Sequence, residues 1–180
     1  MNLTEKNIIQ GCKKGERLAQ QQLYEKYKAM LFGVCLRYAH NRMEAEDFLQ
    51  EGFIRIYRDL YQYQPEKALG AWLRRVMVNC CLRQLEKQKN IFSEVDWNQV
   101  GGSYEMKLEE KEDNREQQLI KMIQQLPPGY RAVFNMYVIE GYTHQEIAEY
   151  LKISANTSKS QLSRAKNLLK NLFKKKVIAT

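Results

Sequence analysis

The sequence contains no long hydrophobic run and no recognisable export signal. No run of about 18 apolar residues occurs along the chain, so we expect no helix that spans a membrane. The first residues, MNLTEKNIIQGCKKGE, lack the apolar core of a signal peptide. We therefore expect the protein to stay in the cytoplasm.

Cysteine is scarce and is not arranged as a set of metal ligands. The four cysteines are Cys12, Cys35, Cys80 and Cys81, and they lack the paired spacing of a zinc site. Cys35 and Cys80 fall in apolar helical stripes, where a free cysteine usually acts as a small core residue. An enzyme that uses Cys80 or Cys81 is one alternative, but the sequence offers these thiols no convincing base partner.

Histidine is scarcer still, because only His40 and His144 are present. The one metal-ligand set that we consider is Glu140, His144 and Glu146, yet His144 comes just inside a capped helix turn, where we expect it to border DNA or solvent. A metal site needs partners that converge at suitable spacing. We therefore expect no metal, no cofactor and no small-molecule substrate.

Acidic residues are missing from the C-terminal segment and concentrated in the middle of the chain. The net charge is +8 and the pI is near 9.3, which favours nucleic acid or an acidic surface as partner. No acid occurs in residues 155–180, whereas residues 94–116 hold eight acids and three bases. This acidic segment contains Gly101-Gly102-Ser103 and predicts a flexible linker between two domains.

Helical periodicity on both sides of this linker predicts an all-α fold of two small domains. We expect domains at residues 1–88 and 114–180, joined by a linker at residues 89–113. The predicted helices run from Thr4 to about Cys12, Glu16 to Ala39, Met43 to Tyr61, Ala71 to Lys89, about Asp113 to Leu126, and Tyr130 to Ile139, with a loop from Tyr61 to Gly70.

The segment at residues 141–170, GYTHQEIAEYLKISANTSKSQLSRAKNLLK, has the pattern of a helix-turn-helix. Thr143 and Glu146 predict a capping box at the start of the first helix. Lys152-Ile153 is the expected turn, after which Ser154 or Asn156 caps the second helix. The polar face of that second helix consists of Asn156, Lys159, Ser160, Ser163, Arg164 and Asn167, and suits a polyanion. The alternative is a solvated amphipathic helix.

Aromatic and basic residues are interleaved around the loop at residues 61–70. The aromatic residues are Tyr57, Tyr61, Tyr63 and Trp72. Planar side chains can stack on unpaired bases while cations follow phosphates, which is typical of single-strand binding. Tyrosines that complete a small core, with solvated arginines outside, are an equally weighted alternative. The nearby cations are Arg55, Arg58, Lys67, Arg74, Arg75 and Arg83.

Three segments together resemble one family. They are DFLQEGFIRIYRDL at residues 47–60, AWLRRVMVN at residues 71–79, and LPPGYRAVF followed by EGYTHQEIAEYLKISANTSKSQLSRAK at residues 126–166. The chain resembles a bacterial RNA polymerase sigma factor of the extracytoplasmic-function (ECF) group in the sigma-70 family, the compact type with only regions 2 and 4. A helix-turn-helix alone is weak evidence, but these segments occur in the family's order and with its linker.

The resemblance implies a non-catalytic initiation subunit that binds core RNA polymerase and promoter DNA. It implies contacts with the beta-prime clamp helices and the beta flap, and an anti-sigma factor, which we expect to be membrane-bound. Docking is implied for Asp47, Gln50 and Glu51, although these residues also suit the start of a helix. Minus-ten recognition is implied for Gln62, Tyr63, Gln64, Lys67, Trp72, Arg75, Asn79 and Arg83. Minus-thirty-five recognition is implied for Thr157, Lys159, Ser160, Ser163 and Arg164.

The chain departs from the family pattern within the helix-turn-helix. Gln161 stands where arginine is common, so we expect one phosphate contact fewer. Lys152 stands where glycine is usual, and a left-handed backbone there costs lysine about 1 kcal/mol. Lys166 also replaces a frequent arginine. The alternative function is a stand-alone helix-turn-helix repressor or activator, which needs no polymerase-docking helix and usually binds DNA as a dimer.

Overall fold

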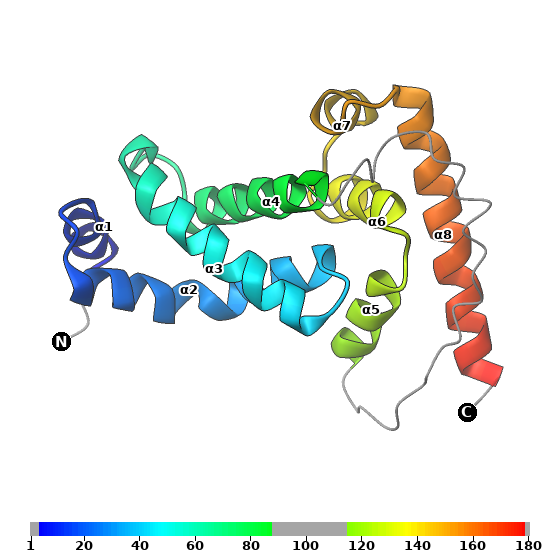
Figure 1. Ribbon diagram of the computed structural model, residues 1–180, viewed down its shortest axis with the longest axis horizontal. Helices are drawn as coiled ribbons and strands as arrows, with labels where there is room; N and C mark the ends of the chain where they lie inside the picture. Colours follow the sequence, from blue (N-terminus) through cyan, green and yellow to red (C-terminus); the bar gives the residue numbers. More distant parts are fainter. Residues whose placement is uncertain (1–3, 88–114, 179–180) are drawn as a thin grey trace. The chain divides into compact units, whose positions relative to one another are not determined.

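The computed structural model describes residues 4–87 and 115–178, and every regular element in these two ranges is helical (Figure 1). The chain divides into two compact units, Met1–Gln84 and Leu85–Thr180. The predicted all-α class with two small domains is therefore confirmed. The acidic linker expected at residues 89–113 lies outside the described residues. Within these two ranges, no helix is long and apolar enough to cross a bilayer.

The first unit contains four α-helices and one short 3-10 turn. They are α1 (Glu5–Lys13), α2 (Arg17–Tyr38), α3 (Arg42–Asp59), the 3-10 turn η1 (Leu60–Gln62) and α4 (Leu69–Lys87). Side chains cap the N-termini of α1 and α3. Oγ1 of Thr4 accepts from the Asn7 amide at 3.4 Å, and Oδ1 of Asn41 accepts from the Glu44 amide at 2.8 Å. The helix boundaries lie within a few residues of those expected from periodicity.

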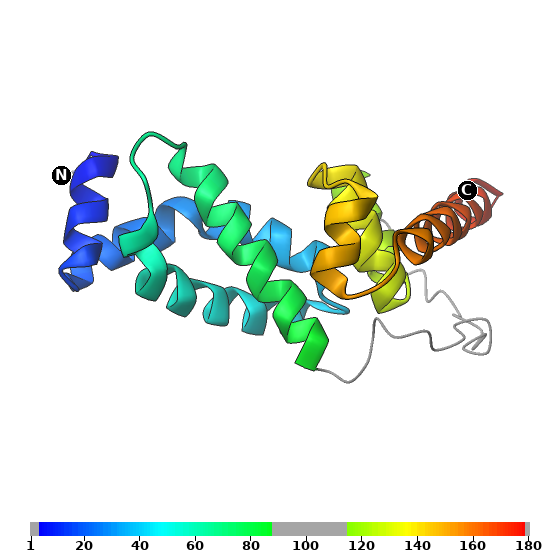
Figure 2. The ribbon, with the colours of Figure 1, turned by 90° about the horizontal axis from the view of Figure 1, so that it is seen from above.

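The core of this unit lies where α4 crosses α2 and α3, as Figure 2 shows. Leu23 and Leu31 of α2, Ile56 of α3 and Met77 of α4 are all 0% exposed. Gly52 leaves room on α3 for the Met77 side chain of α4, because a Cβ atom at residue 52 would lie 2.2 Å from the Met77 sulfur. The buried face of α3 therefore faces α4 and leaves the opposite face of α3 to solvent.

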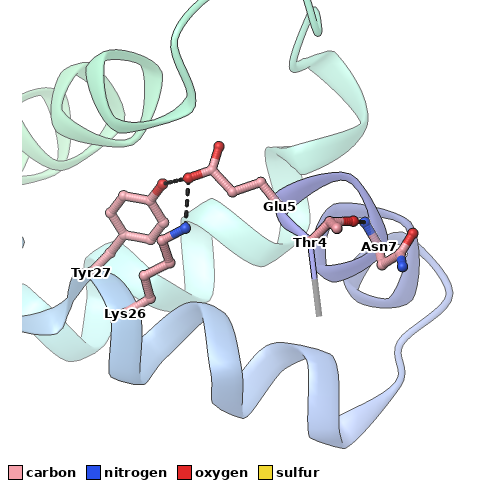
Figure 3. A network of polar contacts seen from close by, with 5 residues as sticks. All are labelled: Thr4, Glu5, Asn7, Lys26 and Tyr27. Atoms are coloured by element: carbon pink, nitrogen blue, oxygen red, sulfur yellow. Dashed lines mark hydrogen bonds and ion pairs between the residues drawn. The ribbon is translucent and has the colours of Figure 1, made fainter. Parts of the chain in front are cut away.

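The N-terminal helix α1 packs on α2 and also contacts η1. Gly11 lets α1 approach α2, because a Cβ at residue 11 would lie 2.5 Å from the Ala19 Cβ. A polar network also links the two helices (Figure 3): Oε1 of Glu5 accepts from the Lys26 ammonium at 2.7 Å and from the Tyr27 hydroxyl at 2.8 Å. These two hydrogen bonds lower the pKa of the Glu5 carboxyl.

The second unit is also helical, with α5 (Arg115–Gln124), α6 (Pro128–Phe134), the π-helical segment η2 (Asn135–Ile139), α7 (His144–Leu151) and α8 (Ala155–Ile178). Proline at the first position of α6 costs no hydrogen bond, because that amide has no intrahelical partner. The single helix expected from Tyr130 to Ile139 is in fact α6 followed by η2.

The core of the second unit lies between α5, α6 and the inner face of α8. Arg131 is buried beside it, and its Nη1 donates to the Gln124 carbonyl at 2.9 Å, which ties α6 to the end of α5. The buried cluster is Met122, Ile123, Leu126, Tyr130, Ala165 and Leu169, with Phe134, Ile139 and Leu172 at its edge. These contacts orient α8 so that its opposite face is left to solvent.

Candidate nucleic-acid interface

The turn between α7 and α8 has the geometry expected of a helix-turn-helix. Oγ1 of Thr143 accepts from the Glu146 amide at 3.2 Å, and Oε2 of Glu146 accepts from the Thr143 amide at 2.7 Å, so the predicted capping box is confirmed. Lys152 has φ 56° and ψ 42°, which is the left-handed backbone expected at this position. Of the two candidate caps for α8, Ser154 is the one used, since its Oγ accepts from the Thr157 amide at 2.9 Å.

The outer face of α8 carries the residues predicted to contact the minus-thirty-five element. Lys159, Ser160, Ser163 and Arg164 are exposed, whereas Thr157 is half-buried beside the Ser154 cap. Nη1 of Arg164 donates to the Tyr130 hydroxyl at 3.4 Å, so α6 helps to orient this guanidinium. The helix therefore presents cations and hydroxyl groups together.

The inner face of α8 contains two polar residues as well as its apolar line. Ser158 is 0% exposed and Gln161 is 5% exposed. Oε1 of Gln161 has no hydrogen-bond partner among the described residues. Position 161 lies three residues after Ser158 and four before Ala165, which is the buried side of the helix. Gln161 is therefore directed into the second unit, and the expected loss of one phosphate contact at this position stays a prediction.

His144 joins η2, α7 and α8. Its Nδ1 lies 2.9 Å from the Ser158 hydroxyl, and its ring stacks on Tyr137 with centroids 4.4 Å apart. Burial lowers the pKa of His144, and the nearby Lys159 and Lys166 ammonium groups lower it further. In the described ranges, no group of three or more His, Cys, Asp or Glu side chains is placed to hold a metal ion. His144 therefore acts here as a contact between helices.

The lowered pKa of His144 predicts that acid destabilises the second unit. The unfolded chain binds this proton near the ordinary pKa of 6.5, whereas the folded chain binds it only at lower pH, so protonation favours unfolding. We expect a lower melting temperature at pH 5.5 than at pH 7.5, measured by circular dichroism on the full chain. His144→Gln should reduce this dependence, and an equal dependence in the variant would contradict the prediction.

All four cysteines are free and buried. Burial raises the pKa of the Cys12 thiol to about 11 and also raises the pKa of Cys80 and Cys81. A thiol must ionise to act as a nucleophile, so these groups are poorly suited to catalysis.

The three residues assigned to polymerase docking are exposed together on α3. Asp47, Gln50 and Glu51 are spaced by three and one residues, so they lie on one side of the helix. Ile54 is 63% exposed and follows Glu51 by three residues, which places it on the same side. Sequence analysis did not assign Ile54, although this spacing already placed it beside Gln50 and Glu51.

The residues assigned to the minus-ten element lie at the end of η1, on the loop between η1 and α4, and on α4 itself. Gln62, Gln64 and Lys67 are exposed, but Tyr63 is only 7% exposed. The Tyr63 hydroxyl donates to the Lys67 carbonyl at 2.6 Å, and its ring packs edge-on against Trp72 with centroids 5.6 Å apart. Tyr63 therefore supports the loop from inside.

The remaining residues assigned to the minus-ten element follow one another along α4. Trp72, Arg75, Asn79 and Arg83 are spaced by three or four residues, which keeps them on one side of the helix. Arg75 and Arg83 are exposed, while Trp72 and Asn79 are half-buried. The structure therefore places exposed amides before α4, and cations and an aromatic edge along one side of α4.

Comparison with known proteins matches both units to parts of a single family. The family model "Sigma-70 region 2" matches residues 23–91, and "Sigma-70, region 4" matches residues 116–169. The RNA polymerase sigma-H factor of Pseudomonas aeruginosa is 26% identical over 177 residues, which covers 92% of this chain and 91% of that protein. The ECF RNA polymerase sigma-E factor of Haemophilus influenzae is 25% identical over 180 residues, which covers 94% and 95%.

A solved structure has a similar fold. The sigma factor RpoE from Bartonella quintana, in a co-crystal structure with the anti-sigma factor NepR, superposes with a TM-score of 0.52 at 20% identity, covering 86% of this chain and 96% of that one.

The chain belongs to the sigma-70 family of RNA polymerase sigma factors, with regions 2 and 4 as its two units. Within the family it falls in the ECF group, whose members direct RNA polymerase to promoters and are not enzymes. A stand-alone helix-turn-helix regulator would not account for the match to region 2.

Proposed function

We propose that this sigma factor docks on core RNA polymerase through the exposed face of α3 and contacts promoter DNA with both units. Residues 1–88 would act as region 2, residues 114–180 as region 4, and residues 89–113 as the linker. The observation that supports this most is the placement of Asp47, Gln50 and Glu51 together on the solvent side of α3. Sigma function would take place in the cytoplasm, where core polymerase is.

The docking partner of this α3 face is the clamp-helix region of the beta-prime subunit. Two carboxylates beside an amide complement a basic helix and steer its approach. Ile54 adds an apolar contact to the same face, because its side chain is 63% exposed. Region 4 would bind the beta flap, so that polymerase holds both units.

The end of η1 and the loop that follows it capture the unpaired minus-ten strand. The exposed amides of Gln62 and Gln64 can each donate and accept hydrogen bonds at a base edge. Lys67, Arg75 and Arg83 are exposed cations that can follow the phosphates. Trp72 and Asn79 would line the edge of the site, and Tyr63 would hold its shape. A base flipped out of the stack is then read by its edges.

The outer face of α8 reads the minus-thirty-five element in the major groove. Lys159 and Arg164 supply charge, and Arg164 can make a bidentate contact with guanine. Ser160 and Ser163 lie between them and can bond to bases or phosphates. Thr157 would contact the backbone at the start of the helix.

An anti-sigma factor would hold this chain until a signal releases it. The Bartonella quintana sigma factor of similar fold is bound to an anti-sigma factor, NepR. We propose a membrane-bound anti-sigma factor for this chain, because that arrangement is common in the ECF group it resembles.

Reconstitution tests the proposed function. The purified chain is added to core RNA polymerase, and run-off transcription is measured on genomic DNA fragments, with core polymerase alone as the control. Transcripts with discrete starts that depend on the chain would support the proposal. If the chain does not bind core polymerase, the proposed function fails.

Trp72→Ala should impair strand opening more than duplex binding. Loss of a ring that borders the unpaired strand weakens capture by about 1 to 3 kcal/mol, so we expect roughly tenfold less opening and little change in duplex binding. Permanganate reactivity of minus-ten thymines measures opening, and gel shift measures binding. Trp72→Phe, which keeps a ring, serves as the matched control. Equal losses of opening and binding would show that Trp72 is only a core residue.

A further inference from the structure

The N-terminal helix α1 is linked to both ends of the loop from Tyr63 to Ala68. It contacts one end directly and reaches the other through Tyr27 of α2. One end is η1, which α1 contacts directly. The other end is the first turn of α4, where a Cβ atom at Gly70 would lie 3.6 Å from Cε1 of Tyr27. A side chain at residue 70 would therefore be in ordinary van der Waals contact with the ring, which places Tyr27 beside the point where the loop enters α4.

Glu5 of α1 holds that ring in place. Figure 3 shows the carboxylate of Glu5 reaching from α1 to Lys26 and Tyr27 on α2. The Tyr27 hydroxyl donates to Oε1 of Glu5 at 2.8 Å, and the Lys26 ammonium donates to the same atom at 2.7 Å. Burial and the Glu5 carboxylate raise the pKa of Tyr27, and Tyr63 contributes to the same shift. Glu5 therefore anchors the hydroxyl end of the Tyr27 side chain.

The packing of α1 on α2 does not depend on this network. Ile8 is 5% exposed and Cys12 is 4% exposed on the inner side of α1, and Gly11 permits the close approach to Ala19. The side chains of Glu5 and Lys26 are 48% and 46% exposed, so their ion pair adds little to stability. The hydrogen bond from Tyr27 to Glu5 therefore serves to orient the Tyr27 ring more than to hold α1 on α2.

The loop needs such support because few of its own contacts fix it. The Tyr63 amide donates to the Leu60 carbonyl at 3.1 Å, and the Lys67 amide donates to the Gln64 carbonyl at 3.1 Å. The Tyr63 hydroxyl closes the loop by its bond to the Lys67 carbonyl. Gln62, Gln64 and Lys67 extend into solvent, so their positions follow the backbone.

We propose that Glu5, by holding the hydroxyl of Tyr27, positions the loop from Tyr63 to Ala68 for the unpaired promoter strand, which makes α1 part of the strand-opening apparatus. Glu5 and Tyr27 are positioning residues and do not touch DNA. The family model for region 2 matches residues 23–91 and does not cover α1. This inference rests on the proposed role of the loop in binding the minus-ten strand.

The test measures how tightly the holoenzyme binds a fluorescent single-stranded oligonucleotide with the minus-ten sequence of a promoter found by run-off transcription. A scrambled oligonucleotide gives the specificity ratio. Glu5→Ala and Tyr27→Phe should each weaken binding three- to tenfold and lower that ratio. Glu5→Gln keeps an acceptor oxygen and should restore much of the loss. The double variant Glu5→Ala with Tyr27→Phe should bind no more weakly than the worse single variant, because both remove one hydrogen bond.

Lys28→Met is the matched control. It breaks the ion pair between Lys28 and Glu25 of α2, which are 2.6 Å apart, and it leaves the hydrogen bond between Tyr27 and Glu5 in place. It should bind the oligonucleotide like the original chain. The melting temperature and the affinity for core polymerase should be unchanged in all these variants. Unchanged oligonucleotide binding in Glu5→Ala and Tyr27→Phe, or a loss that follows a lower melting temperature, would overturn the inference.

A loop variant separates this inference from the proposed function. Gln62→Ala with Gln64→Ala removes the exposed amides and should lower the specificity ratio on its own. If this variant binds like the original chain, the loop is not the reader and the proposed role fails. If it loses binding while Glu5→Ala and Tyr27→Phe do not, only the role of α1 fails.

Discussion

Asp47→Arg combined with Glu51→Arg should abolish detectable binding to core RNA polymerase. Both carboxylates are exposed and lie one helical turn apart on α3, so arginine at both positions meets a basic partner helix with like charge. Charge reversals at such interfaces cost several kcal/mol, which corresponds to a loss of roughly a hundredfold or more. Fluorescence anisotropy with labelled protein measures the affinity. The melting temperature should stay the same because neither side chain is buried.

The matched control changes the net charge equally at other sites. Glu25→Arg with Glu116→Arg replaces exposed acids on α2 and α5, and this variant should bind core polymerase within a few-fold of the original chain. Ile54→Ala tests the apolar part of the same face and should weaken binding without reversing charge. Normal binding by the Asp47 and Glu51 variant would remove the docking assignment.

Lys159→Ala combined with Arg164→Ala should weaken binding to minus-thirty-five duplex DNA by about two orders of magnitude. A bidentate arginine contact contributes about 1 to 3 kcal/mol of discrimination. Each lost phosphate contact should also lower the slope of log affinity against log salt concentration by about 0.9. Gel shift with the holoenzyme at several salt concentrations measures both quantities.

Two further variants show which contacts read sequence. Arg164→Lys keeps the charge but not the planar fork, so it should keep the salt dependence while losing base preference. Arg115→Ala with Lys121→Ala removes the same charge from α5 and should leave minus-thirty-five binding within a few-fold. A comparable loss in this α5 variant would mean that α8 contributes only general charge.

Short-range signals predicted the helices and the turn well. Thr143 and Glu146 are three residues apart, and the capping box depends only on that spacing. The predicted helices left residues 40–42 as a break between them, and the side chain of Asn41 in this break caps α3. Lys152 was placed in the turn by its position between two apolar stripes, and its φ is 56°. Each of these features depends only on residues that lie within one or two helical turns of each other in the sequence.

Features that depend on packing between distant segments could not be predicted in the same way. The sequence does not distinguish Tyr61 from Tyr63, but the structure leaves Tyr61 70% exposed and Tyr63 7% exposed. The difference arises because Trp72, from the next helix, covers the Tyr63 ring. The proximity of Tyr27 to Gly70, at the start of α4, likewise depends on segments more than forty residues apart in the sequence.

The burial of Gln161 has a further consequence for how this sigma factor can be altered. A buried oxygen without a partner costs about 1 to 3 kcal/mol, so Gln161→Met, which has a similar shape, should raise the melting temperature while minus-thirty-five preference stays the same. Thermal unfolding and gel shift together measure this, and changed promoter preference would contradict it. Heat tolerance and promoter choice can then be adjusted at neighbouring positions of one helix, independently of each other.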